Sequence, residues 1–202
     1  VIANAGVSAG TGTEGFESQE QAQQIFAVNV YGVNNTLYPA LLRMLERNGD
    51  GKTNGRGHKG QIALMSSMAA FYGFPGAPAY CASKAAVRVA GEALRVLYKD
   101  RGIKINVICP GYINTDMGSV NQSYRPMRMS AERAARIIAR GLAKDKARIA
   151  FPWPVYALVW LISNLPAAFT DWLLSKLARK PNFEEQEAIR EDKASQEKHP
   201  GD

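Results

Sequence analysis

The length and composition of the chain are those of a single globular domain. Its 202 residues can bury a substantial core, and 46% hydrophobic with 21% charged residues is ordinary for a folded protein. A net charge of +7 would suit an anionic cofactor, nucleic acid or a membrane surface. No single block of Lys and Arg dominates, however, so the charge selects no partner and we expect no nucleic acid.

The cysteines and histidines argue against a disulfide scaffold and a metal centre. Cys81 and Cys109 form no C-x-x-C and fall in an expected helix and strand, which indicates buried thiols in a reducing, cytoplasmic compartment. The only histidines, His58 and His199, have no other plausible ligand nearby, so we expect no metal. We recognise no signal peptide. The first residue, Val1, reads as the inside of a strand, and we expect the chain to be N-terminally truncated.

A short apolar strand is predicted at the start of the chain, from Val1 to Ala3. It is followed by Asn4, Ala5 and Gly6. Small residues and a glycine at the end of a strand let the backbone approach a ligand or a neighbouring strand closely. By itself the tripeptide carries little information.

A long amphipathic helix is predicted from Glu20 to Glu46, because apolar residues recur there at intervals of three and four. Asn29 lies inside this helix. The following stretch, 48–60, is rich in glycine and charge and predicts an exposed loop. It is not a phosphate-binding loop, because that pattern needs a glycine where Glu46 stands and a strand leading into it.

The stretch from Gln61 to Ala86 carries the chemistry. The apolar run 62–65 predicts a buried strand that ends at Ser67, and after a loop rich in Gly and Pro a helix carries Tyr80 and Lys84. Residues four apart share one helix face, and an ammonium beside a phenol favours the phenolate and lowers its pKa from about 10. Tyr80 would then exchange a proton with an alcohol or carbonyl oxygen that Ser67 also binds.

A Tyr and a Lys at this spacing also occur by chance, but Ser67, the loop and the sequence ASKAA add specificity. Together they resemble the active-site segment of the short-chain dehydrogenase/reductase family, over Val1 to about Phe151. The resemblance implies that Tyr80 is the proton donor or acceptor. It also implies that Lys84 lowers the pKa of Tyr80 and holds the nicotinamide ribose, while Ser67 orients the substrate oxygen.

The same resemblance implies roles for residues outside this stretch. Asn29, in an N-x-x-G context with Gly32, would complete the catalytic set by holding a water in a proton relay to the lysine. The remaining matches would contact the cofactor. They are Asn4, Ala5 and Gly6 after the first strand, and Pro110, Gly111, Ile113 and Thr115 after a later one.

The active-site helix is predicted to continue to about Asp100 and to end at Gly102. The elements after it are a central parallel strand at 103–109, a loop over the pocket at 116–129, a helix at 130–142 and a last strand at 146–151. The apolar segment from Phe151 to Leu177 is too short to span a bilayer. It is a substrate-pocket wall or lid, an interfacial membrane anchor, or an oligomer contact. After Lys180 we expect a frayed helix or disorder.

These features predict an α/β fold, a Rossmann-type doubly wound parallel sheet of which only the second half is present. Residues 1–152 would be the C-terminal part of the dinucleotide-binding domain, and 153–202 an apolar extension with a polar tail. The residues that choose between NAD and NADP belong to the missing half, so the choice stays open, and the fragment alone should bind either cofactor poorly.

The function implied by the resemblance is that of an NAD(P)-dependent oxidoreductase. It would interconvert a carbonyl and a secondary alcohol of a small molecule, with a lipophilic substrate suggested by the apolar C-terminal segment. We expect a homo-oligomer in the cytoplasm, with contact to a membrane surface through 151–177 left open. The alternatives are a non-catalytic dinucleotide-binding regulator and a membrane-surface interaction protein of the same fold.

Overall fold

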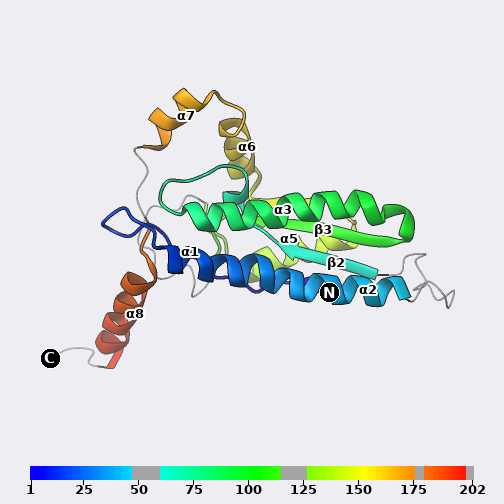
Figure 1. Cartoon of the computed structure of the whole chain (residues 1–202), viewed down its shortest axis with the longest axis horizontal. Coiled ribbons are helices and arrows are strands. Elements are labelled where there is room, and N and C mark those ends of the chain that lie inside the picture. Colours follow the sequence, from blue (N-terminus) through cyan, green and yellow to red (C-terminus); the bar gives the residue numbers. More distant parts are fainter. Residues whose placement is uncertain (47–59, 115–126, 176–179, 199–202) are drawn as a thin grey trace.

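A computed structural model describes residues 1–46, 60–114, 127–175 and 180–198 (Figure 1). The predicted loop at 48–59, most of the predicted loop over the pocket and Thr115 lie outside these residues. In chain order the elements are β1 (Ile2–Ala3), α1 (Gln19–Phe26), η1 (Ala27–Gly32), α2 (Val33–Glu46), β2 (Gly60–Met65), η2 (Met68–Ala70), α3 (Pro78–Tyr98), η3 (Lys99–Arg101), β3 (Ile103–Pro110), α5 (Ala131–Ala143), β4 (Arg148–Phe151), α6 (Trp153–Ile162), α7 (Ala167–Leu174) and α8 (Phe183–Lys198).

The four strands form one parallel sheet in the order β1-β2-β3-β4. β3 lies in its interior and is an almost unbroken run of buried apolar residues, as strands covered on both faces are. Since all four strands run in the same direction, their carboxyl ends meet at one edge of the sheet, where ligands of α/β proteins bind. The fold is therefore the predicted Rossmann-type α/β fold, and the predicted strands and the helix at 130–142 are confirmed.

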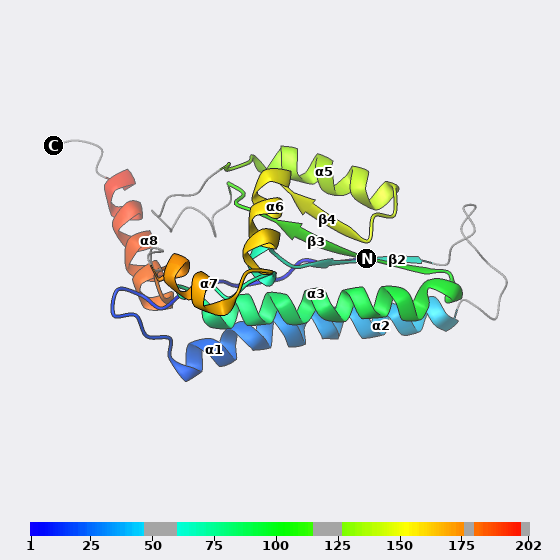
Figure 2. The same ribbon diagram turned by 90° about the horizontal axis from the view of Figure 1, so that it is seen from above.

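Helices cover both faces of the sheet (Figure 2). On one face α2 and α3 pack against β2 and β3 through a cluster that includes Leu37, Ile62 and Ile105. On the other face α5 packs through Ile108, Ala134, Ile149 and other residues. The two cores keep the strands rigid, so the loops at the carboxyl edge are held at fixed spacing.

The predicted single helix at 20–46 is interrupted. A segment with the wider π-helical turn, η1, separates α1 from α2. Asn29 lies in this segment, is completely buried, and bonds to Val7 and Ser83 outside its own helix. A recurrence at threes and fours does not distinguish a π turn from an α turn, which is why the sequence missed it. Such turns frequently occur at functional sites.

The C-terminal segment packs beside the loop that follows β2. The ring of Tyr156 in α6 stands edge-on to Phe71, with 5.3 Å between centroids, and Tyr72 Oη donates to Thr170 Oγ1 of α7 at 2.5 Å. No helix within the described ranges has both the length and the apolar character needed to cross a bilayer. The polar tail forms α8, so of the two states expected after Lys180 the helix is observed.

Candidate active site

Ser67 stands directly after β2, at the carboxyl edge of the sheet. Its Oγ accepts a hydrogen bond from the Ala69 backbone at 3.1 Å and so caps the short helix η2. The neighbouring Ser66 donates to the backbone oxygen of Lys84 at 2.8 Å. These two bonds fix the end of β2 against the first turns of α3.

Tyr80 lies in the first turn of α3, which starts at Pro78 and receives a carboxylate cap from Glu17 to the Ala79 amide at 2.9 Å. Its half-buried phenol hydrogen-bonds the hydroxyls of Ser67 and Ser8. The structure therefore brings Ser67 and Tyr80 together from two different elements, as the sequence predicts. Burial raises the pKa of Tyr80, and the two serine hydroxyls only partly oppose that rise.

Lys84 is 4% exposed and its Nζ lies 6.0 Å from the centre of the Tyr80 ring. The Nζ donates to the backbone oxygen of Met65 at 3.0 Å. Burial lowers the pKa of Lys84 to about 8. The prediction that Lys84 lowers the pKa of Tyr80 is wrong for this chain, because burial disfavours the charged forms of both groups and outweighs their attraction.

Asn29 comes close to Lys84 through Gly6. A Cβ on Gly6 would lie 3.1 Å from Lys84 Nζ and 3.3 Å from Asn29 Oδ1, so a side chain at this position would crowd both groups. Asn29 Nδ2 also donates to Ser83 Oγ of α3 at 3.0 Å. The three residues predicted from separate parts of the sequence thus meet below Tyr80.

The remaining predicted cofactor contacts lie at the same edge of the sheet, except Thr115, which is outside the described residues. Asn4 and Ala5 are exposed at the end of β1. Pro110 ends β3, and the Gly111 amide donates to Phe151 O at 2.7 Å. Ile113 pairs with Met129 in an isolated bridge that joins the two ends of the segment between them.

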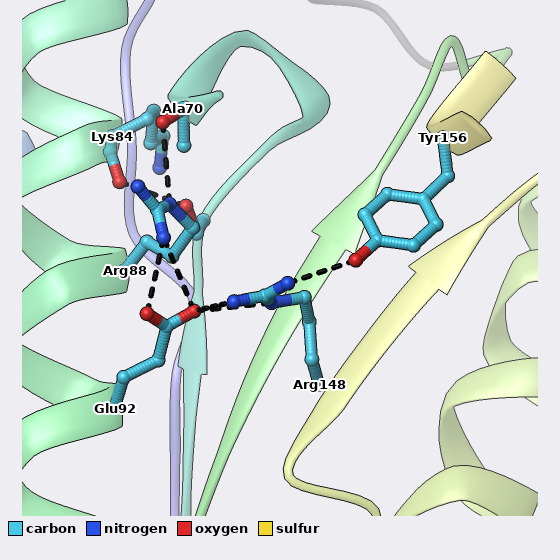
Figure 3. Close-up of polar contacts among 7 residues, drawn as sticks. Ala70, Lys84, Arg88, Glu92, Arg148 and Tyr156 are labelled. Carbon is cyan, nitrogen blue, oxygen red and sulfur yellow. Dashed lines mark hydrogen bonds and ion pairs between the residues drawn. The ribbon is translucent and has the colours of Figure 1, made fainter. Parts of the chain in front are cut away.

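A cluster of charged and aromatic residues, which the sequence did not reveal, supports the site from behind (Figure 3). Glu92 of α3 bonds Arg88 on its own helix at 3.0 Å, and bonds Arg148 of β4. Arg88 also donates to Ala70 O of η2 at 3.2 Å, and Arg148 donates to Tyr156 Oη of α6 at 2.8 Å. The cluster joins four elements around Ser67 and Lys84.

Sequence reasoning also missed the C-terminal strap, residues 180–186, which lies against the loop after β1. The Gly10 amide donates to Pro181 O and the Gly12 amide to Lys180 O, both at 2.9 Å. A local signal was present: Asn182 and Glu185 form a reciprocal cap at the start of α8, with bonds of 2.8 and 3.3 Å. The strap places Lys180 Nζ 4.9 Å from the centre of the Tyr80 ring.

The two cysteines are free and buried, as predicted. Burial raises the pKa of Cys109 to about 12 and also raises that of Cys81. Neither thiol therefore provides a thiolate near neutral pH.

Three comparisons with known proteins agree with this geometry. An uncharacterized oxidoreductase of Myxococcus xanthus is 31% identical over 171 residues, which are 85% of this chain and 63% of that protein. The inactive 2-(S)-hydroxypropyl-CoM dehydrogenase 2 of Xanthobacter autotrophicus is 37% identical over 119 residues, 58% of this chain and 47% of that protein. The chain thus spans less than two thirds of the length of either relative.

Among solved structures, the short chain dehydrogenase of Mycobacterium paratuberculosis bound to NAD is 27% identical. It superposes with a TM-score of 0.58 over 74% of this chain and 59% of that one. The family model described as short chain dehydrogenase matches residues 1–125, more than half of the chain. With the parallel sheet and the joined Ser67 and Tyr80, this match shows that the chain belongs to the short-chain dehydrogenase family of oxidoreductases.

Proposed function

We propose that the protein is an NAD(P)-dependent oxidoreductase that interconverts a carbonyl and a secondary alcohol, with Tyr80 as the proton donor or acceptor. The observation that carries the proposal is the contact of the Tyr80 phenol with the Ser67 hydroxyl at the carboxyl edge of the sheet. Because the chain spans 63% of the Myxococcus relative, the activity is proposed for the full-length gene product.

The residues at this edge fit the nicotinamide end of a dinucleotide. Gly6 leaves the backbone open beside the Lys84 ammonium, where a Cβ would come within 3.1 Å. An ammonium has three donors, and one of those on Lys84 goes to Met65 O, so others can bind ribose hydroxyls. We assign the neighbouring contacts to Asn4, Ala5, Pro110, Gly111, Ile113 and Thr115. When bound, the cofactor supplies or accepts the hydride.

The chain's own groups handle the oxygen of the substrate. Since burial raises the pKa of Tyr80, the phenol is protonated at neutral pH and can donate its proton as a carbonyl becomes an alcohol. Ser67 Oγ already accepts from the Ala69 amide, so its own O–H is available to donate to the same substrate oxygen. In the reverse direction Tyr80 accepts the proton.

Lys84 and Asn29 support this transfer from below. Lys84 holds the ribose, and a bound cofactor and substrate change the surroundings that now raise the pKa of Tyr80. Asn29 fixes the loop after β1 through Val7 and lies beside the Lys84 ammonium, which is where the water relay of our sequence analysis would run.

The apolar C-terminal segment favours a lipophilic substrate. Tyr72 bonds Thr170 and Phe71 packs on Tyr156, so α6 and α7 cover the loop that follows Ser67. This supports the role of a pocket wall for residues 151–177. If it is one, replacing 151–160 with a polar linker raises KM for long-chain ketones more than for short ones.

The direct test is nicotinamide absorbance with the full-length gene product, NAD or NADP and a panel of ketones and secondary alcohols. Oxidation or reduction of a panel member at a rate above the background without protein is expected. A full-length, folded product that turns over none of them would make the non-catalytic regulator the better proposal, as the inactive Xanthobacter relative would suggest.

A second candidate function is contact with a membrane surface. Several large apolar side chains of α6 and α7 are exposed: Trp153, Leu158, Trp160, Leu161, Phe169 and Trp172. Flotation with liposomes, with and without residues 151–177, tests this role. Homo-oligomer formation is proposed from exposed apolar residues on α2 and α3, among them Leu42, Val96 and Leu97, and light scattering tests it. The free thiols support our proposal of a cytoplasmic protein.

A further inference from the structure

The C-terminal strap is attached firmly to the loop after β1. Besides the two backbone bonds from Gly10 and Gly12, Glu185 accepts from the amide and the hydroxyl of Thr13 at 2.8 and 2.7 Å. Gln186 donates to Ser8 O at 3.1 Å. Phe183 packs into a small core with Ile25 and Ala79. The strap is thus part of the folded site, although it lies about a hundred residues after Tyr80.

Gly10 makes this close fit feasible. A Cβ at Gly10 would lie 2.3 Å from Gly76 O and 2.4 Å from Lys180 O, both of them backbone atoms. The loop after β1, the turn before α3 and the strap therefore meet at one point. Any side chain at Gly10 would push the strap away from Tyr80.

The strap carries a second ammonium to the phenol. Lys180 Nζ bonds Ser8 Oγ, and Ser8 in turn hydrogen-bonds the phenol of Tyr80. Lys180 and Lys84 approach the same ring, at 4.9 and 6.0 Å from its centre. Lys84 is fixed on β2 through Met65 O, whereas Lys180 comes from the strap and from the side of Ser8.

A cation beside the reacting phenol attracts an anion strongly, because the partly buried surroundings screen charge less than water does. A carboxylate that accepts a charge-assisted hydrogen bond from Lys180 would lie near the oxygen that Tyr80 protonates. We propose that Lys180 is a specificity-determining residue that binds a carboxylate located close to the reacting carbon. The substrate class is then short oxo acids and the matching hydroxy acids, with any apolar chain extending towards α6 and α7.

This inference rests on the proposed function and is tested by a ratio. The probes are 2- and 3-hydroxy acids of increasing chain length and the corresponding neutral primary amides, which match them in shape. Calorimetry measures binding to the full-length protein with NAD or NADP present, and nicotinamide absorbance measures turnover. Wild type is expected to prefer acid over amide by about tenfold or more.

Three variants assign the preference to the charge on the strap. Lys180→Gln loses it, Lys180→Arg keeps most of it, and Gly10→Ala loses it by displacing the strap. Lys99→Gln, an exposed lysine at the far end of α3, is the control and keeps the wild-type ratio.

The outcomes separate the two proposals. Equal binding of acids and amides by wild type, an unchanged ratio in Lys180→Gln, or no binding of any acid would overturn the role of Lys180, whatever the enzyme turns over. Selective binding of acids without turnover would support the role of Lys180 and count against the proposed reaction.

Discussion

The side chain of Asn29 and the backbone of Val7 bond each other in both directions. Asn29 Oδ1 accepts from the Val7 amide at 2.8 Å, and Asn29 Nδ2 donates to Val7 O at 2.9 Å. A primary amide can make this pair of bonds as a neighbouring peptide would, so the π-helical segment holds the loop after β1 as an additional strand might. The position of Gly6, one residue earlier, depends on the same pair.

Asn29→Ala is expected to lower the free energy of unfolding by about 2–4 kcal/mol, because it leaves two backbone groups of Val7 without their partner. Urea denaturation measures the change. Asn35→Ala, an exposed position on α2, is the control and should be neutral or slightly stabilising. Equal effects of the two substitutions would mean that the bonds to Val7 contribute little.

Tyr80→Phe in the full-length gene product is expected to lower kcat by at least about 10²–10⁴, the usual contribution of a proton-transferring group. The ring and its packing remain, so the unfolding transition should barely move. Tyr98→Phe makes the same change at the other end of α3 and serves as the control. Undiminished turnover by Tyr80→Phe would remove the phenol from the mechanism.

Lys84 gives stability a predictable pH dependence. Its pKa is about 8 in the folded chain, against 10.5 for an ordinary lysine. Between these values the unfolded state binds more protons, so this group makes the free energy of unfolding rise with pH, and its full penalty applies below about pH 8. Lys84→Met should remove about 3 kcal/mol of that rise.

The measurement is chemical denaturation of wild type and Lys84→Met from pH 7 to 10.5. Because other groups titrate in this range, the relevant quantity is the difference between the two curves. Lys99→Met, where the lysine is exposed, should follow wild type. Parallel curves for wild type and Lys84→Met would show that Lys84 keeps an ordinary pKa in the folded protein.

Glu92→Gln is expected to destabilise the protein by about 1–3 kcal/mol, because the carboxylate joins Arg88 and Arg148, which are only 20% and 30% exposed. Glu46→Gln is a matched control. Its carboxylate pairs with Arg43 at 3.1 Å, but both side chains are largely exposed and such pairs contribute between about 0 and 1 kcal/mol. Thermal or urea unfolding of both variants decides whether the buried cluster supports the site.

The part of the site that the sequence predicts is local. Ser67 ends an apolar strand, and Tyr80 and Lys84 are four residues apart on a helix, so their placement follows from the periods of a strand and a helix. Their contact across β2 and α3 then follows from the parallel sheet. The direction of the pKa of Tyr80 did not follow, because it depends on burial that spacing does not reveal.

The residues that the sequence missed are joined over long separations. Glu92 meets Arg148 between α3 and β4, and Lys180 meets Tyr80 across a hundred positions. Charged residues on a helix and in a polar tail usually face solvent, so neither pattern stands out from the sequence. Only the packing of α6, α7 and α8 around the sheet brings these groups together.

The strap also bears on how the protein is made. A ribosome releases the chain from its N-terminus, so α3 and β3 can emerge and pair while residues 180–186 are still unsynthesised. The surroundings of Tyr80 are then completed last, when the strap reaches the loop after β1. A polypeptide cut short before Lys180 would carry Ser67, Tyr80 and Lys84 yet lack one side of their enclosure.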